Sequence, residues 1–184
     1  MMLYPAPTMT RIATRLAREE DIPELQTIIR QSVTGLLHND YTDRQIESGL
    51  IHLFGVDEQL IQDQTYYVAE VDGHIAGSGG WSFHNELYGT HSQGAEYLNT
   101  NEDAARIRTM FVHPEFARQG ISSELLRVSE AAAKSCGFHQ AELIATLTGV
   151  PFYTAKGYAP IKTVEVFLPD GVSLVGLQMS KALN

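Results

Sequence analysis

The chain has 184 residues, of which 43% are hydrophobic, and carries a formal net charge of −9 at pH 7. This length and apolar content suit one globular domain, and the acidic charge argues against nonspecific binding to nucleic acid, which needs a basic surface. The single cysteine excludes an internal disulfide framework, which fits a cytoplasmic protein. We find no apolar stretch of membrane-spanning length, and expect a loose tail over residues 1–9 and one domain over residues 10–184.

The first half of the chain shows signals for both strands and helices. Pro23 in a first turn and Thr42 as an N-cap predict the starts of two helices with apolar residues at helical spacing. Asp72-Gly73 predicts a hairpin turn between two strands, and the Gly-rich run at 77–80 predicts a bulge or a close backbone neighbour. We therefore expect strands at 12–16, 65–71 and 74–83, with helices starting near Ile22 and Thr42.

The second half opens with a long connection at 84–103, which is polar, Gly-rich and without a clear period. Such a connection is often functional, and we expect it to overhang the active site or to be partly mobile. The elements that follow are a strand at 106–112, a helix at 121–136, a strand at 141–147, a short helix from about 150, and strands at 159–168 and 172–179. The order β-α-α-β-β-β-α-β-α-β-β predicts an α/β fold with a mixed sheet and excludes a doubly wound dehydrogenase.

The helix at 121–136 has an apolar stripe that is expected to face the core. Gly137 is expected to end the helix, and Cys136 to be packed within it rather than to act as a nucleophile. The buried side is predicted to consist of Ile121, Leu125, Leu126, Val128 and Ala132.

The stretch between the strand at 106–112 and this helix predicts an anion site. A short loop carrying Arg118, Gln119 and Gly120 leads into the helix N-terminus. Free backbone N–H groups and the helix dipole favour negative charge there, and Gly120 lets the backbone approach closely because it has no Cβ. The spot suits a pyrophosphate.

This stretch resembles the acyl-CoA-binding segment of the GNAT N-acetyltransferase superfamily. The family pattern is Arg/Gln-x-x-Gly-x-Gly/Ala after an apolar strand and a Pro. Gly120 keeps the central glycine, whereas Ala117 and Ser122 depart from the flanking positions. The small Ser122 is compatible with a backbone contact.

A second segment is similar to the other GNAT signature, Phe-Tyr-x-x-x-Gly-Phe/Tyr. It reads Phe152-Tyr153-x-x-x-Gly157-Tyr158, and the frequent Asn-x-x-Ala before it is replaced by Thr146-x-x-Gly149. The order and separation of the two segments also match, and the resemblance covers roughly residues 65–180. It implies a bacterial-type member of the superfamily with the GNAT fold.

The resemblance also implies roles for particular residues. Acetyl-CoA would be the co-substrate, and Tyr153 would be the general acid that protonates the leaving thiolate. Backbone N–H groups at the end of the preceding strand would hold the thioester carbonyl. Cofactor contacts are thus expected from Met110, Phe111, Val112, Arg118, Gln119, Gly120, Ile121, Ser122, Ser123, Thr146 and Phe152.

The general base is harder to assign. Many family members carry a Glu on the strand before the phosphate loop, where this chain has Arg106, which cannot be a base. The alternatives are a water chain or one of four residues from the long connection and the strand before it: His84, Glu86, Glu96 and Asp103. Tyr41 and Trp81, together with His84 and Glu86, could line the acceptor pocket; Tyr41 and Trp81 could equally be core residues.

The leading hypothesis is an N-acetyltransferase that moves an acetyl group from acetyl-CoA to a small amine by direct attack in a ternary complex. The alternatives are a non-catalytic acyl-CoA sensor and an enzyme that acetylates a peptide or protein. The histidines are scattered without ligand spacing, so no metal site is expected. The C-terminal strands could pair across a homodimer.

Overall fold

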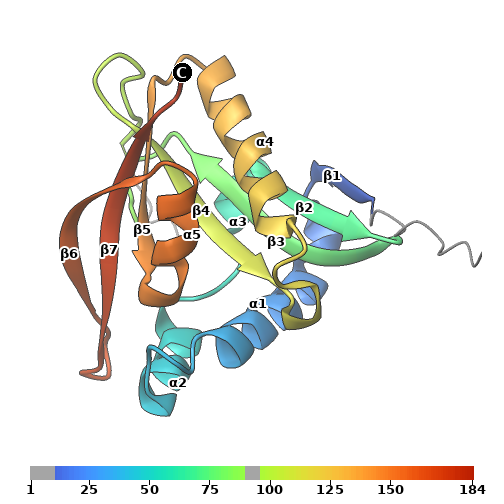
Figure 1. The fold of residues 1–184 in the computed structure, drawn as a ribbon, viewed down its shortest axis with the longest axis vertical. Coiled ribbons are helices and arrows are strands. Elements are labelled where there is room, and N and C mark those ends of the chain that lie inside the picture. The colour runs from blue at the N-terminus through green and yellow to red at the C-terminus, as the bar shows by residue number, and fades with distance from the viewer. Residues whose placement is uncertain (1–10, 90–95) are drawn as a thin grey trace, which may run out of the picture.

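The computed structural model describes residues 11–89 and 96–184 (Figure 1). One seven-stranded sheet has the order β1-β2-β3-β4-β5-β7-β6. The predicted order of strands and helices is confirmed, with one additional short helix, α3. The strands are β1 (Ile12–Leu16), β2 (Tyr66–Val71), β3 (His74–Ser82), β4 (Ala105–Val112), β5 (Gln140–Thr146), β6 (Ala159–Phe167) and β7 (Ser173–Ala182). The helices are α1 (Ile22–Leu36), α2 (Asp43–His52), α3 (Glu58–Gln62), α4 (Ile121–Ser135) and α5 (Val150–Ala155).

The local signals in the sequence produce the predicted starts and turns. Thr42 caps α2 by accepting a hydrogen bond from the Gln45 N–H, and Gln45 reaches back to the Thr42 N–H. Asp72 and Gly73 both have positive φ, 51° and 81°, as a tight hairpin turn between β2 and β3 requires. The proposed tail at 1–9 lies outside the described residues, as do 90–95 of the long connection.

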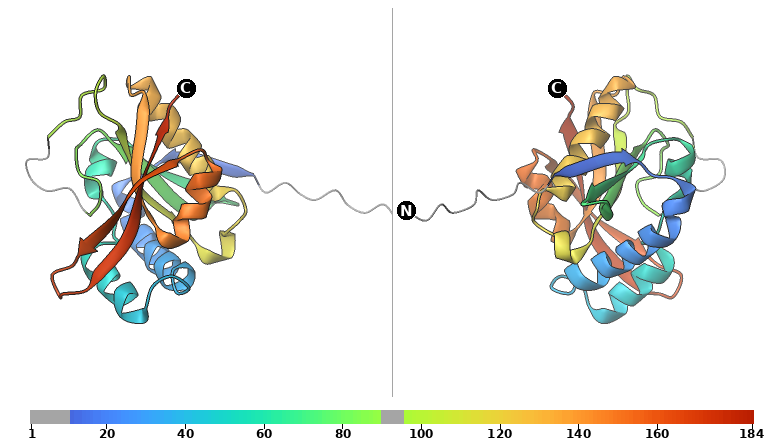
Figure 2. Two further views of the ribbon diagram at one scale, coloured as in Figure 1. Left: turned by 60° about the vertical axis from the view of Figure 1, so that its left-hand side comes forward. Right: turned by 90° about the vertical axis from the view of Figure 1, so that its right-hand side faces the viewer.

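Helices cover both faces of the sheet (Figure 2). The first three helices pack on one face, through clusters that contain Leu25 and Val33, and α4 and α5 pack on the other, through Leu126 and Tyr153. The core therefore has two halves, one on each side of the strands.

Helix α4 corrects two sequence predictions. Its buried side includes Ser129 and Ala133, whereas Val128 and Ala132 are only partly buried. Ser129 tolerates burial because its hydroxyl donates to the Leu125 carbonyl at 2.8 Å. Cys136 is exposed rather than packed, because α4 ends at Ser135 and the chain turns away at Gly137 with φ 96°.

The central feature of the sheet is the divergence of β4 and β5. These parallel strands pair only at Ala105–Ala141 and Arg106–Glu142, although both continue beyond that point. On its other side β4 has a bulge against β3, where Thr109 adopts φ 53°. The two strands thus open like a V toward the N-terminus of α4.

The glycine run of β3 lets the chain approach closely on both sides. Toward β4, a Cβ at Gly77 would lie 2.7 Å from the Phe111 carbonyl oxygen; toward β2, one at Gly80 would lie 2.5 Å from the Thr65 carbonyl oxygen. The predicted bulge and close backbone neighbour at 77–80 are both confirmed.

Candidate active site

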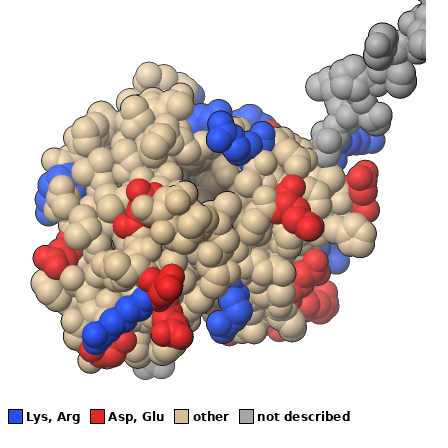
Figure 3. All heavy atoms as spheres, turned by 60° about the horizontal axis from the view of Figure 1, so that its bottom comes forward, with Lys and Arg blue, Asp and Glu red and all other residues tan. Residues whose placement is uncertain are grey.

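A cavity of about 1000 Å³ occupies the gap between the diverging strands. Its lining includes Met110 and Ala145, which belong to the packing on the α4 face, and Phe111 and Leu174, which belong to the packing on the α1–α2 face. The cavity therefore passes through the sheet from one face to the other. Figure 3 shows the molecule from the open end of the V, with a hollow surrounded mainly by uncharged side chains.

The N-terminus of α4 forms one end of this cavity. Gly120 is the N-cap with φ 91°, and Ile121, Ser122 and Ser123 follow it along the cavity wall. The first N–H groups of a helix have no intrahelical partners, and Gly120 has no side chain that could cap them. The geometry of these groups is therefore compatible with an anion.

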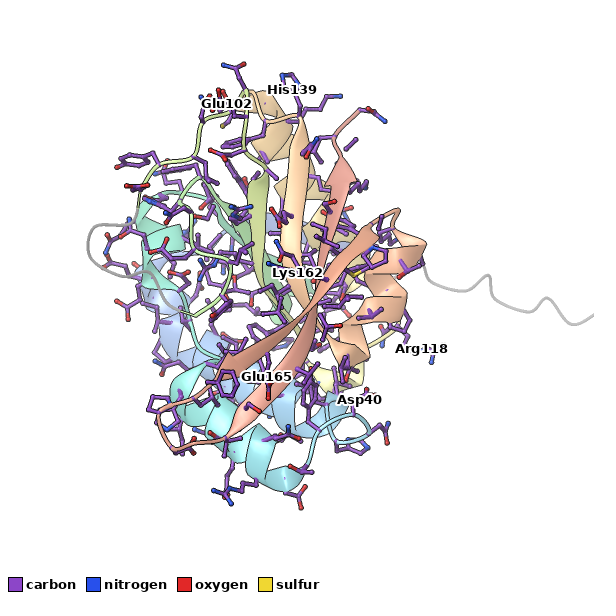
Figure 4. The ribbon with its side chains drawn as sticks, turned by 90° about the vertical axis from the view of Figure 1, so that its left-hand side faces the viewer. Asp40, Glu102, Arg118, His139, Lys162 and Glu165 are labelled. Atoms are coloured by element: carbon purple, nitrogen blue, oxygen red, sulfur yellow. The ribbon has the colours of Figure 1, made fainter. Side chains whose placement is uncertain are left out.

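The two polar side chains of this loop differ in direction. Arg118 is a lining residue whose backbone has a positive φ of 63°. Its exposed side chain projects outward in Figure 4. Gln119 instead donates from Nε2 to the Glu115 carbonyl at 2.9 Å and is not among the lining residues. Its side chain thus stabilises the loop, and any phosphate contact from Gln119 would have to come from its backbone.

The strand residues expected to hold the thioester carbonyl all line the cavity. Met110, Phe111 and Val112 follow the bulge in β4, beyond the last pair with β5. The Val112 N–H donates to the Ser32 hydroxyl at 3.3 Å, so this group already has a partner.

Tyr153 lies on α5, opposite β4 across the gap. Its side chain lines the cavity, is 9% exposed and packs edge-on against Phe152 at 5.0 Å and Tyr158 at 5.6 Å between ring centroids. Burial raises the pKa of the phenol above its ordinary value near 10, so it stays protonated at neutral pH. Phe152 and Thr146 also line the cavity, and Thr146 accepts from the Gly149 N–H at 3.2 Å.

The two aromatic residues expected near the acceptor have different positions. Tyr41 lines the cavity, where its hydroxyl donates to the Val175 carbonyl at 2.6 Å and accepts from the Leu147 N–H at 2.9 Å. Trp81 is a core residue, 2% exposed, with the rings of Phe83 and Phe138 each at 5.8 Å. The structure therefore selects the core alternative for Trp81.

None of the four candidate bases is among the described residues that line the cavity. His84 is buried, and its Nε2 lies 2.9 Å from an oxygen of Asp63. Glu86 lies close enough to Arg108 for its negative charge to raise the pKa of that arginine. Glu96 and Asp103 are exposed.

A buried ion pair at the cavity wall was not predicted. Arg108 Nη2 lies 3.2 Å from Asp57 Oδ2, with side chains 3% and 2% exposed, and the guanidinium also donates to the carbonyl oxygens of Glu86 and Gly89. Burial lowers the pKa of Arg108, and the nearby acids oppose that shift. The signal in the sequence was the alternation Arg106-Ile-Arg108 in an apolar strand, which puts two cations on one face of the sheet.

Arg106, in the place of the usual family Glu, is also paired. Its guanidinium contacts Glu142 on β5, which in turn accepts from the Gln178 side chain on β7. Within the described residues, no group of three His, Cys, Asp or Glu side chains is arranged to hold a metal ion. No helix in the described ranges is long and apolar enough to cross a membrane.

Comparison with known structures gives the same fold. A GCN5-related N-acetyltransferase from Rhodopseudomonas palustris has a TM-score of 0.72 and 20% identity, over 96% of this chain and 99% of that one. PaiA N-acetyltransferase from Thermoplasma acidophilum, solved with coenzyme A, has a TM-score of 0.65 and 18% identity, over 94% and 99%. A putative acetyltransferase from Salmonella typhimurium, solved with acetyl-CoA, has a TM-score of 0.63 and 17% identity, over 95% of each chain.

Sequence comparison identifies the family. No curated protein matches the chain. The model of the acetyltransferase (GNAT) domain matches residues 62–160, more than half of the chain and including both predicted signatures. The chain therefore belongs to the GNAT acetyltransferase family.

Proposed function

We propose that this protein is an N-acetyltransferase that moves an acetyl group from acetyl-CoA to a small primary amine, by direct attack in a ternary complex. The observation that carries the proposal is the continuous cavity that crosses the sheet between β4 and β5. An anion-compatible helix N-terminus lies at one end, and a separate, mostly apolar space lies on the opposite face. Two substrates could therefore enter from different sides and meet in the gap.

Acetyl-CoA suits the residues on the α4 side of the gap. The uncapped N–H groups after Gly120 would bind the pyrophosphate, and Arg118 would swing in to add a cation. Gly120 itself lines the cavity with φ 91°, a backbone conformation that favours glycine. The N–H groups of Met110 and Phe111 would hold the thioester carbonyl in the orientation that exposes its carbon to attack.

The reaction forms a C–N bond and breaks a C–S bond. The amine nitrogen attacks the thioester carbon, and Tyr153 donates its phenolic proton to the sulfur as it leaves. Because burial raises the pKa of Tyr153, its phenol is fully protonated at neutral pH and can donate that proton. The proton lost from the amine would leave through water, because no carboxylate or imidazole of the described residues lines the cavity.

The proposal is tested by measuring free thiol released from acetyl-CoA in the presence of primary amines, with coenzyme A binding measured separately by calorimetry. Amine-dependent thiol release with formation of the N-acetyl product would support the transferase. Coenzyme A binding without thiol release from any amine would support the non-catalytic sensor instead. Absence of coenzyme A binding would refute the assignment of the cavity.

We also propose a cytoplasmic location and a homodimer. The lack of any possible internal disulfide fits a cytoplasmic enzyme. Strand β6 is at the edge of the sheet and exposes Ile161 and Phe167, so a homodimer would form there by strand pairing. Light scattering coupled to size-exclusion chromatography would test the dimer.

A further inference from the structure

We infer that the acceptor is a primary amine on an apolar body, such as an arylalkylamine, rather than a polyamine, a lysine side chain or a free amino acid. This inference rests on the proposed transferase function and concerns the half of the cavity that faces α1 and α2. Three observations lead to it. The lining is mainly apolar, no carboxylate of the described residues lines the cavity, and several polar groups of the wall already make hydrogen bonds within the protein.

The lining of the acceptor half is apolar and comes from three separate segments. Helix α1 and its end supply Leu36 and Leu37, the turn after α2 supplies Leu53 and Phe54, and the connection after β3 supplies Leu87 and Tyr88. Phe54 and Phe111 meet edge-on at 6.2 Å between centroids, which gives this half an aromatic wall. Such surfaces favour an acceptor that buries hydrocarbon rather than one that carries several charges.

No carboxylate lines the cavity among the described residues, whose only charged members there are Arg108 and Arg118. The residues outside the described ranges, 1–10 and 90–95, contain no Asp or Glu in their sequence. The net charge of −9 is therefore carried elsewhere and offers no counter-ion to a second ammonium group. A polyamine or a lysine-containing acceptor would have to bury unpaired positive charge, which is strongly unfavourable.

Four polar side chains of the wall already have other partners. The hydroxyl of Tyr41 makes two backbone hydrogen bonds, and the Ser32 hydroxyl accepts from the Val112 N–H. Thr148 donates to Asp40 at 2.7 Å, and Thr146 accepts from the Gly149 N–H. A polar acceptor body would find few free groups to replace its lost hydration.

Arg118 belongs to the proposed pyrophosphate end, which leaves Arg108 as the lining cation that an acceptor carboxylate could reach. Its guanidinium is instead held by Asp57 and by the carbonyl oxygens of Glu86 and Gly89. These contacts fasten the connection that carries Leu87 and Tyr88 against β4, so Arg108 shapes the acceptor wall. Because Asp57 already balances its charge, Arg108 offers no free cation to an acceptor carboxylate.

The test compares four acceptors with the full-length enzyme and acetyl-CoA: phenethylamine, phenylalanine, spermidine and Nα-acetyl-lysine amide, whose side-chain amine is free. We expect kcat/KM for phenethylamine to exceed that for each other amine by at least about tenfold, or about 1.4 kcal/mol. Equal or better use of spermidine or the lysine derivative would overturn the apolar acceptor. Preference for phenylalanine over phenethylamine would overturn it in favour of a carboxylate site at Arg108.

Failure of the underlying function would look different. If no amine releases thiol, the transferase proposal itself fails and the acceptor class falls with it. If thiol release occurs only with the polar amines, the transferase stands and the acceptor inference alone is wrong.

A paired substitution tests the cause. Leu87→Asp places a carboxylate on the acceptor wall and should shift the spermidine-to-phenethylamine ratio of kcat/KM by at least about fivefold toward spermidine. Ile51→Asp makes a similar change on the outer surface of α2, at a residue 72% exposed and outside the cavity lining, and should leave the ratio unchanged. An unchanged ratio in Leu87→Asp, with thiol release retained, would contradict the proposed wall.

Discussion

Replacing Tyr153 by Phe separates the effect of the proposed proton donor from the effect of ring packing. The substitution removes one hydroxyl and keeps the ring that packs against Phe152 and Tyr158. The phenol faces a cavity, and burial holds its pKa above the ordinary value, so the wild-type residue carries its proton throughout the neutral range. The variant should therefore lose the proton donor without losing the wall of the cavity.

The expected loss of rate follows from general acid catalysis. A positioned proton donor contributes about 10²–10⁴-fold to a rate, so kcat of Tyr153→Phe should fall at least about 100-fold, equivalent to about 2.7 kcal/mol in the barrier. The dissociation constant of coenzyme A should change less than about threefold, because the pyrophosphate site at α4 is untouched. The free energy of unfolding should change by less than about 0.5 kcal/mol, since the ring packing is retained.

Tyr158→Phe is the matched control. Tyr158 is buried in the same aromatic cluster, but its hydroxyl donates to Glu130 at 2.9 Å and it does not line the cavity. Removing that hydroxyl should lower the stability by about 1 kcal/mol, or about 2–4 °C in Tm, and leave kcat unchanged. The two variants should thus separate in opposite directions on the two measurements.

The assay is steady-state thiol release with saturating amine, combined with thermal unfolding and calorimetric binding of coenzyme A. If Tyr153→Phe keeps kcat within about threefold of wild type, the assignment of Tyr153 as the acid is refuted, because loss of the proton donor in the rate-limiting step should lower kcat by much more. An equal loss of kcat in Tyr158→Phe would refute the specificity of the effect.

Three other outcomes follow from the geometry. Gly120→Ala should lower the stability by about 1 kcal/mol because φ is 91° there. It should also weaken coenzyme A binding by about tenfold in calorimetry. The control is Gly73→Ala, at a turn with φ 81° and open space, which should lose similar stability and keep its affinity for coenzyme A. Arg108→Met removes the counter-charge 3.2 Å from buried Asp57 and should destabilise by about 3 kcal/mol in urea unfolding, with part of the loss restored when Asp57→Asn is added. The acid form of Tyr153 is lost only as pH rises through its pKa, which burial raises, so kcat should show no alkaline decline below about pH 10.

The sequence predicts the elements well where the signal is local. The capping residues of α2, the hairpin turn at Asp72-Gly73 and the loop into α4 each follow from residue types at adjacent positions, and each is confirmed in the structure. The phosphate-compatible end of the cavity is predictable for the same reason, since it consists of one strand, one loop and one helix start.

The rest of the site depends on contacts between distant segments. No local pattern indicates that β4 and β5 part after the Arg106–Glu142 pair, yet this divergence creates the cavity. Polar residues of the long connection were natural candidates for a base, but His84 pairs with Asp63 from the end of α3. Such pairings link residues far apart in the chain, and periodicity carries no information about them.

Arg106 shows how these distant contacts bear on the chemistry. In many family members the corresponding residue is a Glu that handles the proton of the amine, whereas here the strand carries the cation and the acid, Glu142, lies opposite on β5. Gln178 on β7 also binds Glu142, so the pair joins three strands at the point where the V begins. The position that carries a Glu in many relatives therefore holds the closed end of the V in this protein. An enzyme so arranged gains most from an acceptor whose amine loses its proton readily, and an apolar wall promotes that loss because it disfavours the charged ammonium.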